Sequence, residues 1–176
     1  MDVLQAIRTR RSIRKFQDKA VPEELVRVML EAAMFAPSAR NAQPWQYVVI
    51  DDRRMLSAYG RKHPNAEMAQ QAPLGILVCG DKRLELSPGY WPVDCAAAVQ
   101  NLLLAAHAVG LGAVWTGVYP REDRMATLRQ MCNLPPEVMP HSLILVGYPG
   151  ESPPMPERFR PDRVYRNCFG QPYLWE

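Results

Sequence analysis

Five cationic side chains lie within nine residues near the start of the chain, in the stretch RTRRSIRKF from Arg8 to Phe16. The whole chain carries a formal net charge of only +3, so this density of charge is local. Like charges held this close repel one another, and a bound anion would offset that repulsion. Arginine forks match phosphate oxygens, and Ser12 adds a hydroxyl donor beside them. The candidate anions are a nucleic acid, a membrane surface, an acidic substrate or one phosphate group, and a solvated basic turn is the alternative without a ligand.

A second polar stretch, APSARNAQPW, links an expected helix to an expected strand. Pro37 predicts the end of the helix, and Pro44 forces an extended backbone into the strand. Between them, Ser38, Asn41 and Gln43 supply short polar groups on a loop whose flanks are rigid, and such loops commonly carry binding residues. A helix-capping turn alone would explain Pro37 and Ser38 but not the polar residues that follow.

Composition narrows the function classes. A chain of 176 residues with 48% apolar and 22% charged residues is typical of one soluble globular domain. No apolar run is long enough for a membrane span, and the N-terminus lacks the pattern of a signal peptide. The cysteines and histidines have no metal-ligand spacing, which predicts reduced thiols and a cytoplasmic location; they are Cys79, Cys95, Cys132, Cys168, His63, His107 and His141.

The sequence pI of about 8.7 is mild, and downstream of the cluster acids alternate with bases, as on solvated helix faces. A nucleic-acid binder would spread its cations along one face and add an aromatic platform. The basic cluster is therefore interpreted as part of a pocket.

Apolar periodicity and capping residues predict alternating helices and strands. The helices are expected at Val3 to about Thr9, Pro22 to before Pro37, Arg53 to Tyr59, Pro92 to Gly110 and 121–131, and the strands at Trp45–Ile50, Leu74–Gly80, 113–118 and from His141 onward. Asp2 is expected to cap the first helix, with Val3, Leu4 and Ile7 turned inward, and the second helix to bury Leu25, Val28, Met29 and Ala32.

Gly110-x-Gly112 resembles part of a dinucleotide-binding fingerprint, but these glycines leave a helix and enter a strand, whereas the fingerprint leaves a strand and enters a helix. We interpret Gly110 as a helix C-cap and Gly112 as part of a turn.

The last segment, residues 151–176, has no periodicity but contains many aromatic side chains, and it is too apolar for a disordered end. It needs a surface to lie on, either a partner subunit or the body of its own domain. We expect residues 1–150 to form a single domain and residues 151–176 to form a C-terminal arm.

The motifs RRSIRKF, APSARNAQPW and DCAAAVQNLLLAAHAVGLGAVWTG, in this order, resemble the FMN-dependent nitroreductase family over about Val3 to Arg160. The resemblance implies an α+β fold with a mixed, mostly antiparallel sheet flanked by helices. It also implies an intertwined homodimer with two FMN sites at the interface. The C-terminal arm would then pack on the partner subunit.

The resemblance also implies roles for individual residues. Arg10, Arg11 and Ser12 would hold the FMN phosphate and ribityl chain, joined by Arg158 and Arg160 of the tail. Arg14 would lie near N1 and O2 of the flavin, Asn65 would reach its pyrimidine ring, and the Thr116-Gly117 peptide after Trp115 would donate toward N5. The cofactor-binding set is completed by the loop that would contact the flavin of the partner's site: Pro37, Ser38, Ala39 and Asn41.

The implied activity is a ping-pong reaction in which NADH or NADPH gives hydride to the flavin and a nitroaromatic, a quinone or a similar conjugated electrophile then takes the electrons. Arg14 and Gly117 are the expected catalytic groups, through the field at N1 and the hydrogen bond at N5. The alternatives are other flavin chemistry, such as dehalogenation or flavin breakdown, and storage or sensing of FMN without turnover. One departure is Met68, which stands where many relatives have a lysine, so one cation near the flavin is missing.

Overall fold

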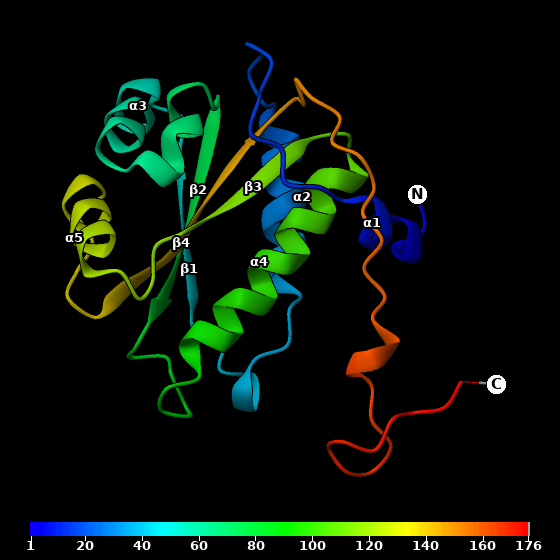
Figure 1. Ribbon diagram of the computed structural model, residues 1–176. Coiled ribbons are helices and arrows are strands. Elements are labelled where there is room, and N and C mark those ends of the chain that lie inside the picture. Colours follow the sequence, from blue (N-terminus) through cyan, green and yellow to red (C-terminus); the bar gives the residue numbers. More distant parts are fainter. Residues whose placement is uncertain (176) are drawn as a thin grey trace.

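The computed structural model describes residues 1–175, which form three layers with a sheet between two groups of helices (Figure 1). The α-helices are α1 (Val3–Thr9), α2 (Glu23–Met34), α3 (Arg53–Lys62), α4 (Trp91–Ala108) and α5 (Glu122–Met131). The strands are β1 (Trp45–Ile50), β2 (Leu74–Asp81), β3 (Gly112–Gly117) and β4 (Val138–Gly147). Short 3-10 segments are η1 (Ala39–Asn41), η2 (Pro64–Gln70) and η3 (Pro161–Arg163). The expected order of elements is confirmed, with boundaries that differ by a few residues.

The sheet has the order β1-β2-β4-β3, and all three strand pairings are antiparallel. Its parallel component within residues 1–175 is the isolated bridge between Ser12 and Ala113. The predicted α+β class with a mostly antiparallel sheet is confirmed. Strand β3, which is expected to carry catalytic backbone groups, lies at one edge.

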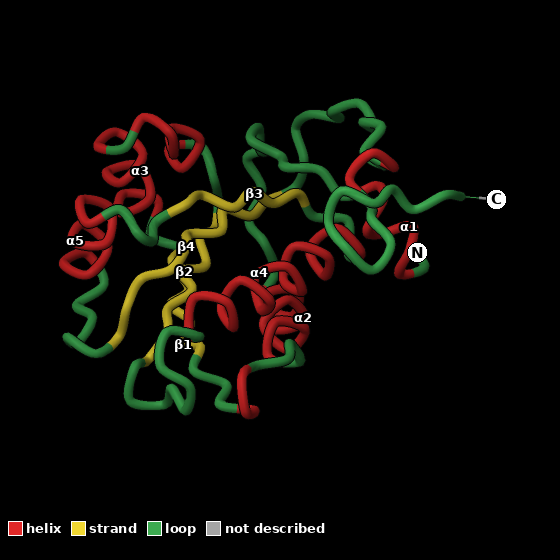
Figure 2. The backbone as a smooth tube through the Cα atoms, turned by 60° about the horizontal axis from the view of Figure 1, so that its bottom comes forward, coloured by secondary structure: helices red, strands yellow, loops and turns green. Residues whose placement is uncertain are grey.

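Both faces of the sheet are buried, because its two inner strands are almost entirely apolar. Successive side chains of a strand point to opposite faces. Ile76 and Ile144 therefore pack with α2 and α4, whereas Leu77 and Leu143 pack with α3 and α5. Figure 2 shows the strands between these two pairs of helices. This double-sided core makes β3 and β4 a rigid support for whatever lies at the edge.

The prediction that the apolar residues of α1 face the core is wrong. Asp2 caps the helix as predicted, its carboxylate accepting a hydrogen bond from the Gln5 N–H at 2.8 Å. Val3, Leu4 and Ile7 are nevertheless exposed, and Ala6 is the buried residue of this helix. The apolar face of α1 finds no partner surface within the described chain.

The second helix differs from its prediction in a similar way. Met29 is buried as expected, but Val28 is 40% exposed, and Val26 and Ala33 are buried in its place. The helix begins at Glu23, with Pro22 as its N-cap, so the start is one residue later than predicted.

The two glycines of the Gly110-x-Gly112 motif have structural roles. Gly112 is the first residue of β3, so its predicted place in a turn is wrong. Gly110 has φ +81°, the left-handed conformation usual just after a helix end. A Cβ on Gly112 would lie 2.8 Å from Ile13, so this glycine allows the segment after α1 to approach the strand. These contacts account for both glycines without a dinucleotide.

The tail, residues 151–175, contains only the short η3 turn and an isolated bridge between Tyr165 and Pro172. Its largest apolar side chains are exposed, among them Phe169 at 90% and Leu174 at 79%.

No helix within residues 1–175 is long and apolar enough to cross a membrane. All four cysteines are free thiols, as predicted.

Candidate functional site

The basic segment after α1 is held between β3 and the end of β4. Ile13 N–H donates to the Ala113 carbonyl of β3 at 3.0 Å. Further along, at Lys15 and Gln17, the segment pairs with the chain that leaves β4. Gln17 N–H donates to the Tyr148 carbonyl at 2.9 Å, and Gly150 N–H donates to the Lys15 carbonyl at 2.8 Å. The cations of the opening motif are therefore fixed against the edge of a rigid sheet.

Glu151 fixes the centre of this segment. Its carboxylate oxygen Oε1 accepts the backbone N–H of Arg14 at 2.5 Å and that of Lys15 at 3.1 Å. The hydrogen bond from Arg14 N–H is the largest cause that lowers the pKa of Glu151. Glu151 accepts hydrogen bonds from the two backbone N–H groups, and the side chains of Arg14 and Lys15 are not hydrogen-bonded to it.

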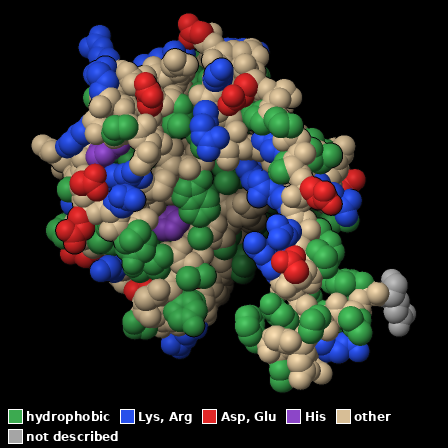
Figure 3. Space-filling view, viewed as in Figure 1, with side chains coloured by type: hydrophobic (Ala, Val, Ile, Leu, Met, Phe, Trp, Pro, Cys, Tyr) green, Lys and Arg blue, Asp and Glu red, His purple; other side chains and the backbone are tan. Residues whose placement is uncertain are grey.

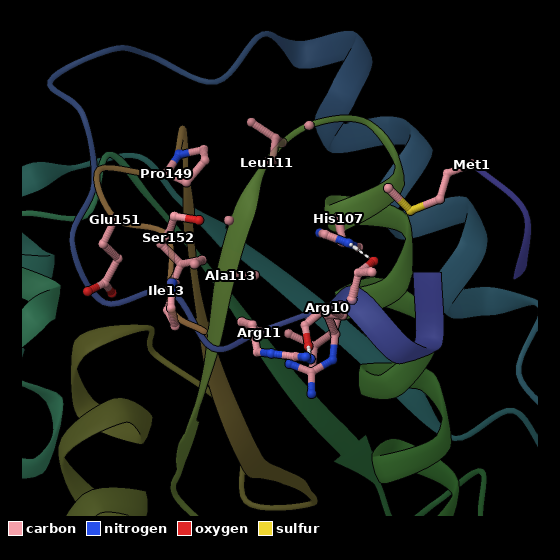
Figure 4. Close-up of a pocket in the computed structure, with 15 residues that line it drawn as sticks. Met1, Arg10, Arg11, Ile13, His107, Leu111, Ala113, Pro149, Glu151 and Ser152 are labelled. Atoms are coloured by element: carbon pink, nitrogen blue, oxygen red, sulfur yellow. Dashed lines mark hydrogen bonds between the residues drawn. The ribbon is translucent and has the colours of Figure 1, made fainter. Parts of the chain in front are cut away.

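Arg10 and Arg11 line a cavity of about 330 Å³, and Arg158 is close enough for its charge to influence Arg10. Figure 4 shows the first two side chains next to each other beside β3, and Figure 3 shows Lys and Arg side chains along the hollow between body and tail. The Nε of Arg10 is buried and has no hydrogen-bond partner among residues 1–175. Burial, and then the charges of Arg11 and Arg158, lower the pKa of Arg10.

Arg11 and His107 shape the same cavity. The guanidinium of Arg11 donates to the carbonyl of Arg8 at 2.8 Å, and its Nε donates to Pro154 in the tail at 3.3 Å. His107, near the end of α4, lies 2.8 Å from the hydroxyl of Thr9, and burial is the main cause that lowers its pKa. Arg11 thus ties the tail to the end of α1.

Strand β3 presents an open edge next to these cations. The Ala113 carbonyl points away from β4, because it accepts from Ile13. Alternate residues of a strand direct their backbone groups to the same side, so the N–H groups of Trp115 and Gly117 also face the open edge. A Cβ on Gly117 would meet no atom of the chain within 4 Å. A planar ligand edge therefore finds a free donor and open space at Gly117.

Arg14 lines a second, polar cavity of about 530 Å³, on the side toward η2. Pro64 and Met68 line it as well, and Asn65 lies between them in η2. Glu151 contacts both this cavity and the first, so the two adjoin. The structure brings Arg10, Arg11, Ser12, Arg14 and the η2 segment to one side of the molecule.

The loop after α2 is held in a constrained conformation. Three non-glycine residues have positive φ: Arg40 at 55°, Asn41 at 56° and Gln43 at 49°. Ser38 Oγ accepts the N–H of Gln43 at 2.9 Å, and Asn41 Oδ1 accepts the side-chain N–H of Gln43 at 2.9 Å. Such backbone strain is concentrated at binding sites, where surrounding contacts enforce it.

Within one chain this loop and the basic segment lie at opposite ends of α4 (Figure 1). Ala39 N–H donates to the buried Asp94 carboxylate in the first turn of the helix at 2.9 Å, while Thr9 meets His107 in its last turn. At 1.5 Å per residue, Asp94 and His107 are about 20 Å apart along the helix axis. Pro37, Ser38 and Ala39 are therefore not brought to Arg10 within one chain.

Arg160 forms an exposed pair with Asp162 at 3.2 Å, whereas Arg158 is close enough to influence Arg10. The predicted role of Arg160 at the phosphate thus stays a prediction.

Sequence reasoning missed Glu151, Asp94 and His107 as parts of the site. Each meets a segment far away in the chain, and the groups it meets carry no sequence signature.

Comparison with known proteins decides the family. The family model described as "Nitroreductase family" matches residues 7–64 and 55–148. The chain belongs to the nitroreductase family. A relative from Methanothermobacter thermautotrophicus, named "Putative NADH dehydrogenase/NAD(P)H nitroreductase", is 52% identical over 94% of this chain and 86% of its own.

Solved structures agree with the family. The structure of a protein with the same name from Parabacteroides distasonis is 38% identical over 94% of this chain and 98% of its own, with a TM-score of 0.91. An FMN-dependent nitroreductase from Clostridium difficile is 27% identical over 95% of this chain and all of its own, with a TM-score of 0.88. The predicted family, fold class, oxidoreductase class and cofactor are confirmed by these matches.

More distant relatives are named for other reactions. A 5,6-dimethylbenzimidazole synthase from Rhodospirillum rubrum is 28% identical over 84% of this chain and 82% of its own. An iodotyrosine deiodinase from Haliscomenobacter hydrossis is 25% identical over 88% of this chain and 82% of its own. Family membership alone therefore does not fix the electron acceptor.

Proposed function

We propose that this chain is a homodimeric, FMN-dependent oxidoreductase that takes hydride from NADH or NADPH by a ping-pong mechanism. It passes the electrons to nitroaromatic compounds, quinones or similar conjugated electrophiles. The single observation that carries the proposal is the buried, unpartnered Nε of Arg10, flanked by Arg11 and Arg158 beside the open edge of β3. A buried guanidinium nitrogen without a partner is costly, and a phosphate oxygen would satisfy it.

The residues present fit the FMN phosphate at this position. Arg10 and Arg11 line the cavity, Ser12 follows them and forms an isolated bridge with Ala113 of β3, and the charge of Arg158 in the tail influences Arg10. Exposed ion pairs contribute little to stability, so the pair between Arg160 and Asp162 leaves Arg160 able to turn toward a bound phosphate.

The bound FMN supplies the redox chemistry, accepting hydride at one side of its ring system and passing electrons on. The residues of the chain would orient the FMN and supply the electrostatic field around its ring. The N–H of Gly117 would donate a hydrogen bond to the ring, and Trp115, whose side chain is 38% exposed, would lie beside it. Arg14, with no salt bridge among residues 1–175, would stabilise negative charge on the reduced flavin.

A second copy of the chain is proposed to complete each site. Pro37, Ser38, Ala39 and Asn41 would come from the partner, because their loop lies about 20 Å along α4 from the basic segment of its own chain. Exposed apolar side chains support this arrangement, since soluble monomers rarely expose large contiguous apolar patches. They include Val3, Leu4 and Ile7 of α1, Phe35 and Val93, and the aromatic residues of the tail, residues 151–175.

The test is the absorbance spectrum of the purified protein, followed by anaerobic addition of NADH or NADPH with and without a nitrofuran or quinone. The proposal predicts a yellow protein that is bleached by a nicotinamide and recoloured by the acceptor. A protein that binds FMN but is bleached by neither nicotinamide would instead store or sense FMN. A colourless protein indifferent to added FMN would contradict the proposal altogether.

A further inference from the structure

Arg124, in the first turn of α5, contacts the edge of β3 where the proposed function places the flavin. Its Nη1 donates to the carbonyl of Gly117 at 2.6 Å. The N–H of the same glycine is the donor that faces the open edge. Arg124 therefore contacts the residue on which the proposed hydrogen bond to the ring depends.

Gly117 has little else to fix its orientation. It has no side chain, and a Cβ built on it would meet no heavy atom within 4 Å among residues 1–175, its chain neighbours apart. Glycine backbones are more mobile than those of other residues. The hydrogen bond from Arg124 anchors the carbonyl of Gly117, and so limits the backbone torsions of the residue whose N–H lies in the preceding peptide unit.

The charge of Arg124 is also available at this place. Within residues 1–175 it makes no salt bridge, and it is only partly exposed. The nearest acid along the chain, Asp123, lies instead 3.7 Å from His63. Met68 lines the cavity with Arg14 and brings no charge.

We propose that Arg124 is a positioning residue of the redox site, which orients the Gly117 peptide and supplies a positive charge that Met68 does not. The inference rests on the proposed function. Because reduction adds negative charge to the ring, a nearby cation stabilises the reduced form more than the oxidised form. Arg124 therefore raises the reduction potential of the bound FMN.

Three substitutions separate the two effects. Arg124→Lys keeps a donor and the charge, Arg124→Gln keeps a donor alone, and Arg124→Met keeps neither. Arg129→Gln is the matched control, because Arg129 lies on the same helix and also donates to a backbone carbonyl, that of Pro135 at 2.7 Å, away from β3. The readouts are the reduction potential of bound FMN, its dissociation constant, and the melting temperature of the protein without FMN.

The expected result for Arg124→Gln is about a tenfold loss in the preference for reduced over oxidised FMN, equivalent to about 30 mV more negative for a two-electron couple. Arg124→Lys keeps most of the potential, Arg124→Met additionally weakens FMN binding, and Arg129→Gln matches the wild type. An unchanged potential in Arg124→Gln and Arg124→Met overturns the inference. So does an equal change in Arg129→Gln, or a loss confined to the melting temperature. If the wild-type protein binds no FMN, the proposed function fails, and this inference with it.

Discussion

The carboxylate of Glu151 lies 2.5 Å from the backbone nitrogen of Arg14 and accepts its N–H. This contact joins the segment after β4 to the basic motif near the N-terminus, residues separated by most of the chain. It holds the backbone of the motif from the side opposite β3. The cations are thus positioned by an acid that leaves their side chains unpaired.

Removing this contact should weaken cofactor binding. Glu151→Ala is expected to raise the dissociation constant of FMN by on the order of tenfold, because two backbone N–H groups lose their charged acceptor. Glu151→Gln keeps an acceptor and should lose less. Fluorescence quenching of FMN on titration measures both. Equal affinities for Glu151→Ala and the wild type would show that the contact has no part in the site.

Arg10→Ala should weaken FMN binding by about ten- to a hundredfold, the magnitude of a lost charge-assisted hydrogen bond. Its burial and its unpartnered Nε make it the residue most dependent on an anion. Arg27→Ala is the control, since Arg27 forms an exposed pair with Glu31 on α2. Equilibrium dialysis with FMN and with riboflavin tests the phosphate assignment: the loss should be confined to FMN. A variant as yellow as the parent would refute it.

Arg14→Ala should act mainly on the rate of reduction. Its side chain lines the polar cavity and makes no salt bridge within residues 1–175. Its loss therefore removes a positive charge from the site without breaking an ion pair that holds the fold. Stopped-flow reduction under anaerobic conditions should be slowed about tenfold or more, an order of magnitude typical of one lost electrostatic contact. FMN affinity should change less than in Arg10→Ala. A rate equal to that of the wild type would remove Arg14 from the mechanism.

His141 should make the protein sensitive to acid. Its ring is buried near Trp91 and Trp115, and burial lowers its pKa to about 4 from 6.5. Protons therefore bind the unfolded chain more tightly, so stability is lost as the pH falls from about 6.5 toward 4, by up to about 3 kcal/mol. Denaturant unfolding at pH 7 and pH 4.5 measures this, and His141→Gln should reduce the difference. The same difference in both proteins would assign the acid sensitivity to other groups.

The strands could be predicted from the sequence because each is an apolar run with clear ends. Leu74–Asp81 is buried throughout, and its continuous apolar character predicted a central strand. Gly110 correctly marked the end of α4. The face of α1 could not be predicted from periodicity, because Val3, Leu4 and Ile7 form an apolar stripe that stays exposed in the described part of the chain.

The candidate site was predictable where its residues are neighbours in the sequence. Arg10 and Arg11 gather because they are adjacent, and Ser12 follows them onto β3. Glu151, Asp94 and Arg124 were not predictable, because each acts on a backbone group of a distant segment: Arg14, Ala39 and Gly117. Such contacts depend on the fold and leave no spacing pattern.

The central claim is that each site takes its phosphate cations from one chain and its polar loop from another. Arg10→Ala removes the first half. Ala39→Trp places a bulky side chain in the polar loop and so obstructs the second half, but it keeps the backbone N–H of residue 39 that donates to Asp94. The most direct measurement is the FMN content of mixed dimers, made by co-expressing the two variants with different affinity tags and purifying them in tandem.

If the halves come from different chains, one site of each mixed dimer combines both substitutions and the other combines none. The account then predicts about half the FMN content of the wild-type dimer, although each variant alone binds little. Mixed dimers that bind no more FMN than either variant alone would contradict it.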